Sequence, residues 1–279
     1  MNEQTRRIFI AGGSGACTRQ AAMAPMAGWG QALHLFTQGF EVVNAARAGA
    51  SSRSFYERGR LAWILENIAP GDLLLISFGH NDMRAEDGRF TAPFSDFQFY
   101  LRKYTDGARA RGAHPVLVPG VERRVFDAFG NMRRSLGVYP QAVRELSRTV
   151  SVPLVDLHEF TSTWWERLGA EESKKIFLYL EPGEHPNYPD GVEDNSHLRP
   201  HGALECARFV AHELYAQRVL APEHFRNLDA HVPEQEVTWL PDDVFEHLTK
   251  SRVSPVGPVG ASGAVSASGP AGAVSEGVA

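Results

Sequence analysis

Cysteine is nearly absent from this sequence, which contains two among its 279 residues. Cys17 and Cys206 are too few for a disulfide framework or for a cysteine-rich zinc site. The histidines His185, His197 and His201 have no acidic or cysteine partner at the spacing of a metal site, so we expect neither a metal nor another cofactor. Cys17 and Cys206 are therefore predicted to be separate free thiols.

The sequence also lacks an excess of positive charge and any long hydrophobic run. Its net charge is −5 and its isoelectric point is near 6.1, so nucleic acid is not an expected partner. The strongest apolar segment, residues 72–78, has the length of a strand and is far too short for a membrane helix, so no membrane partner is expected. Residues 1–10 show no signal-peptide pattern, which predicts a cytoplasmic location.

Short apolar runs alternate with amphipathic segments through most of the chain. The runs at residues 7–11, 41–45, 72–78, 114–118 and 152–155 predict five strands. Apolar residues recur with helical spacing at residues 54–69, 96–111, 139–150 and 200–219. This alternation predicts an α/β fold in which helices cover both faces of a five-stranded parallel sheet, a three-layer α/β/α sandwich.

A single domain at residues 1–250 accounts for all of these periodic segments. Within it, residues 183–195 are rich in proline, aspartate, asparagine and glycine, which predicts a loop. Residues 251–279 consist almost entirely of serine, glycine, alanine, valine and proline. Such a segment cannot bury enough apolar surface to offset its loss of conformational entropy, and we expect a disordered tail.

A glycine-rich loop, Gly12-Gly13-Ser14-Gly15, follows the first predicted strand. A dinucleotide-binding loop would require a third glycine at position 18, which is occupied by Thr18. A tight turn explains the glycines without any function. A loop that exposes Ser14 as a nucleophile also fits, although Ala16 excludes the G-x-S-x-G elbow. Taken alone, the loop favours the tight turn.

Other residues suited to catalysis follow the later strands or precede the last helix. Gly49 comes after the second predicted strand, and Asn81 comes after the third. Asp194 and His197 stand just before the helix predicted at residues 200–219. Because the carboxyl ends of parallel strands meet at one edge of a sheet, these residues are expected near Ser14. This joint pattern is much more specific than any of its parts.

Together these segments resemble the SGNH, or GDSL-like, hydrolase superfamily, and most of all its rhamnogalacturonan acetylesterase branch. The resemblance extends over residues 7–220 and includes Gly28-Trp29-Gly30-Gln31 and residues 51–55, 78–82 and 119–124. It implies a flavodoxin-like fold. One position departs from the family pattern, because Gly13 stands where the family normally has an aspartate that orders the loop.

The resemblance implies a serine esterase that acts through an acyl-enzyme. Ser14 would be the nucleophile, His197 the general base, and Asp194 the acid that orients the imidazole. The oxyanion hole would consist of the backbone amides of Ser14 and Gly49 and the side-chain amide of Asn81. Asp194 lies three residues before His197, and this spacing is expected to let the carboxylate fold back over one turn.

The branch resemblance further implies a substrate and its contacts. The expected substrate is an acetylated oligosaccharide, derived from pectin and of the rhamnogalacturonan type, and the expected substrate contacts are Arg53, His80, Arg123 and Arg124. Two alternatives stay open: a lipase-like or thioesterase-like hydrolase of other small esters, and a weakened or non-catalytic carbohydrate-binding relative, which Gly13 favours. The sequence does not predict an oligomeric state.

Overall fold

The computed structural model describes residues 5–85 and 88–254 of the chain. Its central sheet has four parallel strands in the order β2–β1–β3–β4. The strands are β1 (Arg6–Gly12), β2 (Phe40–Asn44), β3 (Leu73–Ser77) and β4 (His114–Leu117). All five residues of β3 are buried, because helices cover both faces of the sheet.

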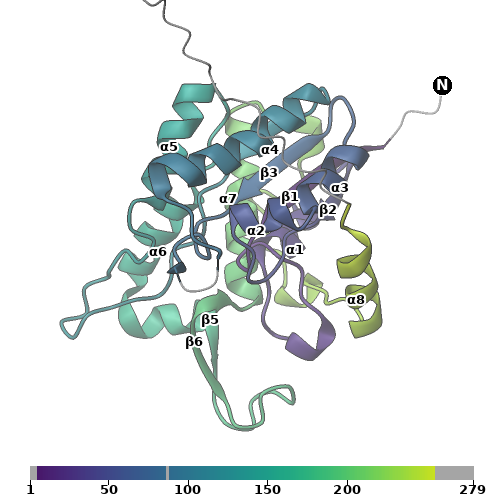
Figure 1. The fold of residues 1–279 in the computed structure, drawn as a ribbon. Coiled ribbons are helices and arrows are strands. Elements are labelled where there is room, and N and C mark those ends of the chain that lie inside the picture. Colours follow the sequence, from purple (N-terminus) through teal and green to yellow (C-terminus); the bar gives the residue numbers. More distant parts are fainter. Residues whose placement is uncertain (1–4, 86–87, 255–279) are drawn as a thin grey trace, which may run out of the picture.

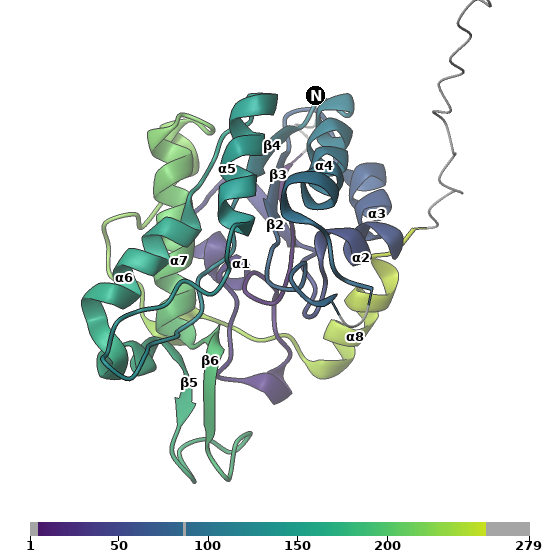
Figure 2. The same cartoon turned by 60° about the vertical axis from the view of Figure 1, so that its left-hand side comes forward.

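Two layers of helices enclose the sheet, as Figure 2 shows. Their bounds are α1 (Trp29–Ala32), α2 (Ser52–Glu57), α3 (Arg60–Asn67), α4 (Gln98–Ala110), α5 (Tyr139–Val150), α6 (Leu157–Glu172), α7 (Pro200–Ala216) and α8 (Asp242–Ser251). Alternate residues of β1 point to opposite layers. Ile8 and Ile10 pack in one core with α1, α6 and α7, and Phe9 and Ala11 pack in the other with α2 to α5. The predicted three-layer α/β architecture is confirmed.

The strand order places the loop after β1 at a point where the chain changes direction across the sheet. From β1 the chain passes to β2 on one side, whereas β3 lies on the other side of β1 and leads to β4. Loops at the carboxyl ends of the strands diverge at such a point and leave a crevice. Ser14 follows β1 at this position.

The prediction of a fifth strand in the parallel sheet is wrong, because the described residues form only four. Residues 152–155 make only an isolated parallel bridge, in which Leu154 lies beside Leu117. The amide of Leu117 donates to the carbonyl of Pro153, and the amide of Val155 donates to the carbonyl of Leu117. Pro153 has no amide proton for the ladder, and the chain enters α6 only two residues after Val155, so the pairing ends there.

The loop expected at residues 183–195 is only partly correct. An antiparallel hairpin, β5 (Phe177–Leu180) with β6 (Val192–Leu198), projects from the body of the domain (Figures 1 and 2). Asp194 and Asn195 therefore lie on a strand. The short apolar run of β5, which was not predicted as a strand, provides the pairing partner.

The helix expected over residues 54–69 is interrupted near its middle. Gly59 has a φ of 71°, which separates α2 from α3. The amide of Ser254 donates to the carbonyl of Gly59, so the chain beyond α8 packs closely against this break. Residues 251–254 belong to the segment expected to be a tail, and the remainder of that segment, residues 255–279, lies outside the described residues.

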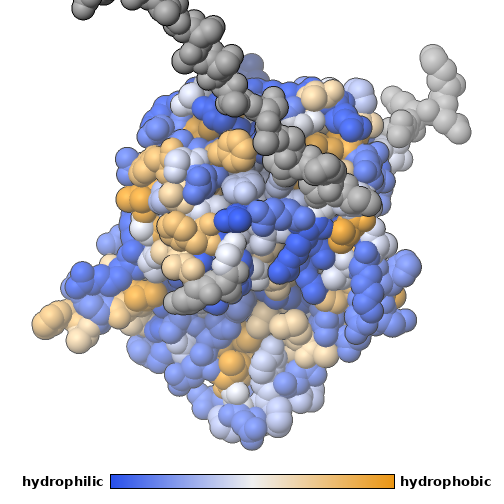
Figure 3. Space-filling model, viewed as in Figure 1, coloured by the Kyte–Doolittle hydropathy of each residue, from blue (hydrophilic) through white to orange (hydrophobic). Residues whose placement is uncertain are grey.

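Two further predictions concern the cysteines and the membrane. Cys17 and Cys206 are both buried free thiols, which confirms the prediction that they are separate. In the described part of the chain, no helix is both long and apolar enough to cross a bilayer. On the face shown in Figure 3, hydrophobic residues form small groups between hydrophilic ones.

Candidate active site

The loop after β1 is held tightly against β3. A side chain at Gly12 would have its Cβ 2.7 Å from the carbonyl oxygen of Ser77, so only glycine fits between the two strands. The amide of Gly13 donates to that same carbonyl over 3.1 Å. The amide of Trp29 donates to the carbonyl of Gly15 over 3.0 Å, which joins the loop to the start of α1. These contacts fix the backbone on both sides of Ser14.

Arg19 is a buried cation beside the loop that carries Ser14. It is 3% exposed, and its Nη2 donates to the carbonyl oxygen of Ser14 over 2.7 Å. Its backbone amide donates to the side-chain oxygen of Gln31, another buried residue. Arg19 therefore helps to order the peptide of Ser14.

The two predicted oxyanion-hole residues beyond Ser14 lie on adjacent loops. Gly49 has a φ of 77° in the turn after β2, a conformation that favours glycine. The side-chain amide of Asn81 donates to the carbonyl of Ala50 over 3.0 Å, which links the loop after β3 to that turn. Nη1 of Arg89 donates to the carbonyl of Gly49 over 3.1 Å and approaches Oδ1 of Asn81 at 3.4 Å. Both loops are thus held in one arrangement.

A buried carboxylate, Asp82, organises the loop that carries Asn81. Oδ1 of Asp82 accepts hydrogen bonds from the amide and hydroxyl of Ser52 and from the hydroxyl of Thr91. Oδ2 accepts from the amide of Gly79 over 3.1 Å. Burial raises the pKa of Asp82 to about 6, although these hydrogen bonds act in the opposite direction.

We expect Asp82→Asn to change how stability depends on pH. Between about pH 6 and 3.8 the folded wild type holds a proton on Asp82 that the unfolded chain does not. The wild type's free energy of unfolding should therefore rise relative to that of the variant as the pH falls through this window. Urea unfolding of both proteins across the window measures the difference. A difference that shrinks on acidification would contradict this prediction, and the exposed Asp106→Asn is the control.

Asp194 and His197 are in direct contact on β6. Nδ1 of His197 lies 2.7 Å from Oδ2 of Asp194. Oδ1 of Asp194 accepts hydrogen bonds from the amides of Ser196 and His197. Burial tends to raise the pKa of Asp194, but the hydrogen bonds from His197 and the two amides outweigh it and lower the pKa below its ordinary value. Asp194 is therefore ionised at neutral pH and holds the imidazole in one orientation.

The contact between Asp194 and His197 depends on a β-bulge and not on a helical turn. The expectation that the carboxylate folds back over one turn is therefore wrong. On β5, Phe177 and Leu178 are neighbours, but their partners on β6 are Leu198 and Asp194. The residues between these partners, 195–197, leave the ladder and let His197 turn back toward Asp194. Residues three apart on a regular strand would point to opposite faces.

Three consecutive side chains after β4 point in three directions. Glu122 is buried, and its carboxylate accepts a hydrogen bond from the hydroxyl of Ser135. Oε2 of Glu122 lies 3.0 Å from Nε2 of His158. Arg124 is also buried, and its guanidinium donates to Oδ1 of Asn195, within the bulge. Arg123, between them, lines the cleft described next. Glu122 and Arg124 therefore anchor this loop and the bulge, and neither lines the cleft.

One cleft of about 800 Å³ brings together most of the residues predicted for the site. Among the residues that line it are Ser14, Gly49, His80, Asn81, Arg123 and His197. Arg53 and Arg124, which were expected to contact substrate, do not line it. The guanidinium of Arg53 is paired with Glu57 on α2, and that of Arg124 is bound to Asn195, Ser173 and Tyr179.

Sequence reasoning missed three arginines of the cleft. Arg19, Arg84 and Arg89 line it together with Arg123, although the whole chain has a net charge of −5. Burial, with the nearby charge of Arg123, lowers the pKa of His80 to about 3, so this imidazole is neutral at neutral pH. In the described residues, no group of three or more histidine, cysteine or acidic side chains could hold a metal ion.

Comparisons with known proteins identify the family of this chain. The sequence model of the GDSL-like Lipase/Acylhydrolase family matches residues 10–189. Rhamnogalacturonan acetylesterase RhgT of Bacillus subtilis is 47% identical over 212 residues, which cover 76% of this chain and 90% of that protein. The probable rhamnogalacturonan acetylesterase YesY of the same organism is 34% identical over 73% of this chain and 90% of its own length.

The solved structures agree on the fold. The crystal structure of YxiM from Bacillus subtilis is similar with a TM-score of 0.65 and 26% identity, over 77% of this chain and 57% of that chain. The expected SGNH hydrolase fold is therefore confirmed, with four strands in its described sheet. The chain belongs to the GDSL-like lipase/acylhydrolase family and is a carboxylic ester hydrolase.

Proposed function

We propose that this chain is a serine acetylesterase in which Ser14, His197 and Asp194 form a catalytic triad. The observation that carries the proposal is the bulge on β6, which holds His197 against Asp194 while His197 lines the same cleft as Ser14. Unassisted, a serine hydroxyl is a weak nucleophile at neutral pH, and an imidazole oriented by a carboxylate is the usual means of activating it.

The reaction proceeds in two steps. Ser14 Oγ bonds to the acetyl carbonyl carbon while its proton passes to Nε2 of His197, and the sugar oxygen then leaves with that proton. Water attacks the acetyl-serine in the second step, again through His197, and acetate is released. The negative oxygen formed in each step accepts hydrogen bonds from the amides of Ser14 and Gly49 and from the side chain of Asn81.

The substrate that we propose is an acetylated oligosaccharide that contains galacturonate, as in rhamnogalacturonan. The names of the relatives RhgT and YesY support the carbohydrate class. Arg84, Arg89 and Arg123 line the cleft and are at least partly exposed, which supports an acidic sugar, because guanidinium groups bind carboxylates with paired, charge-assisted hydrogen bonds. A lipase-like enzyme would instead require an apolar channel for a long acyl chain.

Acetate release from a substrate panel tests this proposal. We expect wild type to release acetate faster from acetylated rhamnogalacturonan oligosaccharides than from acetylated xylan oligosaccharides. Arg123→Met should raise KM for the acidic substrate by roughly tenfold, the loss expected for one charge-assisted hydrogen bond, and leave KM for the neutral one unchanged. Arg53→Met is the matched control, because Arg53 lies outside the cleft.

Three results would contradict the proposal in different ways. A preference for long acyl chains would identify a lipase-like or thioesterase-like enzyme. Binding of oligosaccharide without any acetate release would identify a non-catalytic relative, for which Gly13 is the supporting feature. Equal changes in KM for acidic and neutral substrates in Arg123→Met would show that the arginines do not select the substrate. The proposed esterase reaction would be unaffected by that result.

A further inference from the structure

A second cavity lies between the end of β2 and α8. Its volume is about 190 Å³, several times the roughly 30 Å³ of one water molecule in the liquid. It is lined by Thr18, Val42, Asn44, Ala45, Ala46, Arg47, Arg60, Leu240, Phe245, Leu248, Thr249 and Arg252. None of these residues lines the catalytic cleft.

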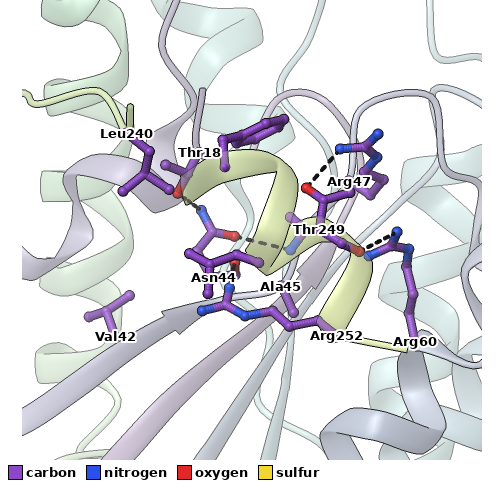
Figure 4. Close-up of a pocket in the computed structure, with 12 residues that line it drawn as sticks. Thr18, Val42, Asn44, Ala45, Arg47, Arg60, Leu240, Thr249 and Arg252 are labelled. Atoms are coloured by element: carbon purple, nitrogen blue, oxygen red, sulfur yellow. Dashed lines mark hydrogen bonds between the residues drawn. The ribbon is translucent and has the colours of Figure 1, made fainter. Parts of the chain in front are cut away.

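Three arginines from three separate segments converge on this cavity. Figure 4 shows Arg47, Arg60 and Arg252 gathered near the last turn of α8. Nη1 of Arg47 donates to the hydroxyl of Thr249 over 3.0 Å, and Nη2 of Arg60 donates to the carbonyl of Thr249 over 3.2 Å. Nη1 of Arg252 donates to the carbonyl of Asn44 over 2.6 Å. A guanidinium carries five N–H donors, so these bonds use only a small part of the donors present.

The lining is rich in donors and poor in acceptors. The hydroxyls of Thr18 and Thr249 each accept a hydrogen bond, from Asn44 and Arg47, which leaves the hydroxyl protons available to donate. No aspartate or glutamate is among the described residues of the lining, and Glu41, whose charge acts on Arg252, lies outside it. The partial negative charge at the end of α8 offsets only part of the charge of three guanidinium groups.

The electrostatics agree with an excess of positive charge at this site. Burial, together with the charges of Arg47, Arg58 and Arg252, lowers the pKa of Arg60 to about 10. Burial also lowers the pKa of Arg252. Like charges at this spacing repel each other, and an anion bound among them would relieve that repulsion.

We propose that this cavity is a binding site for a small oxyanion, a carboxylate or a phosphate that carries at most a sugar-sized group. Arg47, Arg60 and Arg252 bind the charged oxygens, and the apolar side chains of Leu240, Phe245 and Leu248 bound the rest of the ligand. The site is joined to the nucleophile loop, because the Asn44 amide that donates to Thr18 also donates to the carbonyl of Ala16.

Calorimetric titration of the full chain with inorganic phosphate, acetate and galacturonate, at constant ionic strength, tests the proposal. We expect saturable binding of at least one of the three anions. The three dissociation constants then show whether the site prefers a phosphate or a carboxylate. Arg60→Met and Arg252→Met should each weaken that binding by tenfold or more. Arg58→Met, an exposed neighbour outside the lining, should change the dissociation constant less than twofold.

The catalytic cleft is also cationic, and Arg123→Met separates the two sites. Anion binding that depends on Arg60 and Arg252 should be unchanged in this variant, whereas any binding of galacturonate in the catalytic cleft should be weaker. Loss of binding in Arg123→Met, unchanged binding in both Arg60→Met and Arg252→Met, or no saturable binding of any anion would each overturn the proposal. Circular dichroism of every variant verifies folding. If Arg60→Met does not fold, anion binding by Arg252→Met alone tests the proposal.

Discussion

Ser14→Ala is expected to reduce the rate of acetate release by a factor on the order of 10⁴ or more, the usual effect of removing a triad nucleophile. Without the hydroxyl no acetyl-enzyme can form, although the oxyanion donors and the bound substrate remain. Hydrolysis of p-nitrophenyl acetate measures the rate. A serine-directed phosphonate should label the wild type and fail to label the variant, which tests the covalent step independently of turnover.

The stability of this variant should be close to that of wild type. Ser14 holds its loop through backbone groups, since its carbonyl accepts from Arg19, and alanine keeps that carbonyl. The exposed Ser95→Ala is the matched control for loss of a serine hydroxyl and should retain full activity. Undiminished hydrolysis by Ser14→Ala would rule out the proposed mechanism, whatever the substrate.

Asp194→Asn is the second substitution with a large expected effect, a fall in kcat on the order of 10⁴. An asparagine amide beside Nδ1 of His197 would donate where the carboxylate now accepts. The imidazole would then carry its proton on Nε2, the atom that must accept the proton of Ser14. The backbone bonds from Ser196 and His197 to position 194 can persist, because asparagine retains one side-chain oxygen.

The measurement for this variant is the pH dependence of kcat alongside its thermal stability. Asp190→Asn, an exposed acid on the same hairpin connection, is the control and should behave as wild type. A fall in kcat of less than tenfold in Asp194→Asn would show that another group orients His197. If the loss of activity matched the loss of folded protein, the carboxylate would stabilise the hairpin and would not be needed to orient the imidazole.

Periodicity predicted the regular elements of this fold well where one face of a helix is buried. The helix expected over residues 139–150 is α5, with the same bounds, because Ala142, Val143 and Leu146 bury one stripe and Pro140 occupies the first turn. Pairing between strands was harder to predict. Residues 152–155 have the composition of a strand, but pairing also depends on Pro153 and on the nearby start of α6.

The predicted residues that follow strands line the cleft, whereas the arginines on irregular loops were not predicted. Gly49 and Asn81 line the cleft with Ser14, because loops at the carboxyl ends of parallel strands meet there. Arg84 and Arg89 come from a loop without periodicity, so no pattern in the sequence indicated their direction. The overall net charge of −5 also averages over the whole molecule and conceals a local excess of arginine.

The projecting β5–β6 hairpin carries both His197, the proposed base, and Asp194, whereas Ser14, the proposed nucleophile, follows strand β1 of the central sheet. Flexing of the hairpin relative to the sheet would therefore carry imidazole and carboxylate as one rigid unit. Such motion would vary the gap that the serine proton must cross and preserve the tautomer. We therefore expect the hairpin alone to set the alignment of imidazole and carboxylate, and the packing of the hairpin against the sheet to set their distance from Ser14.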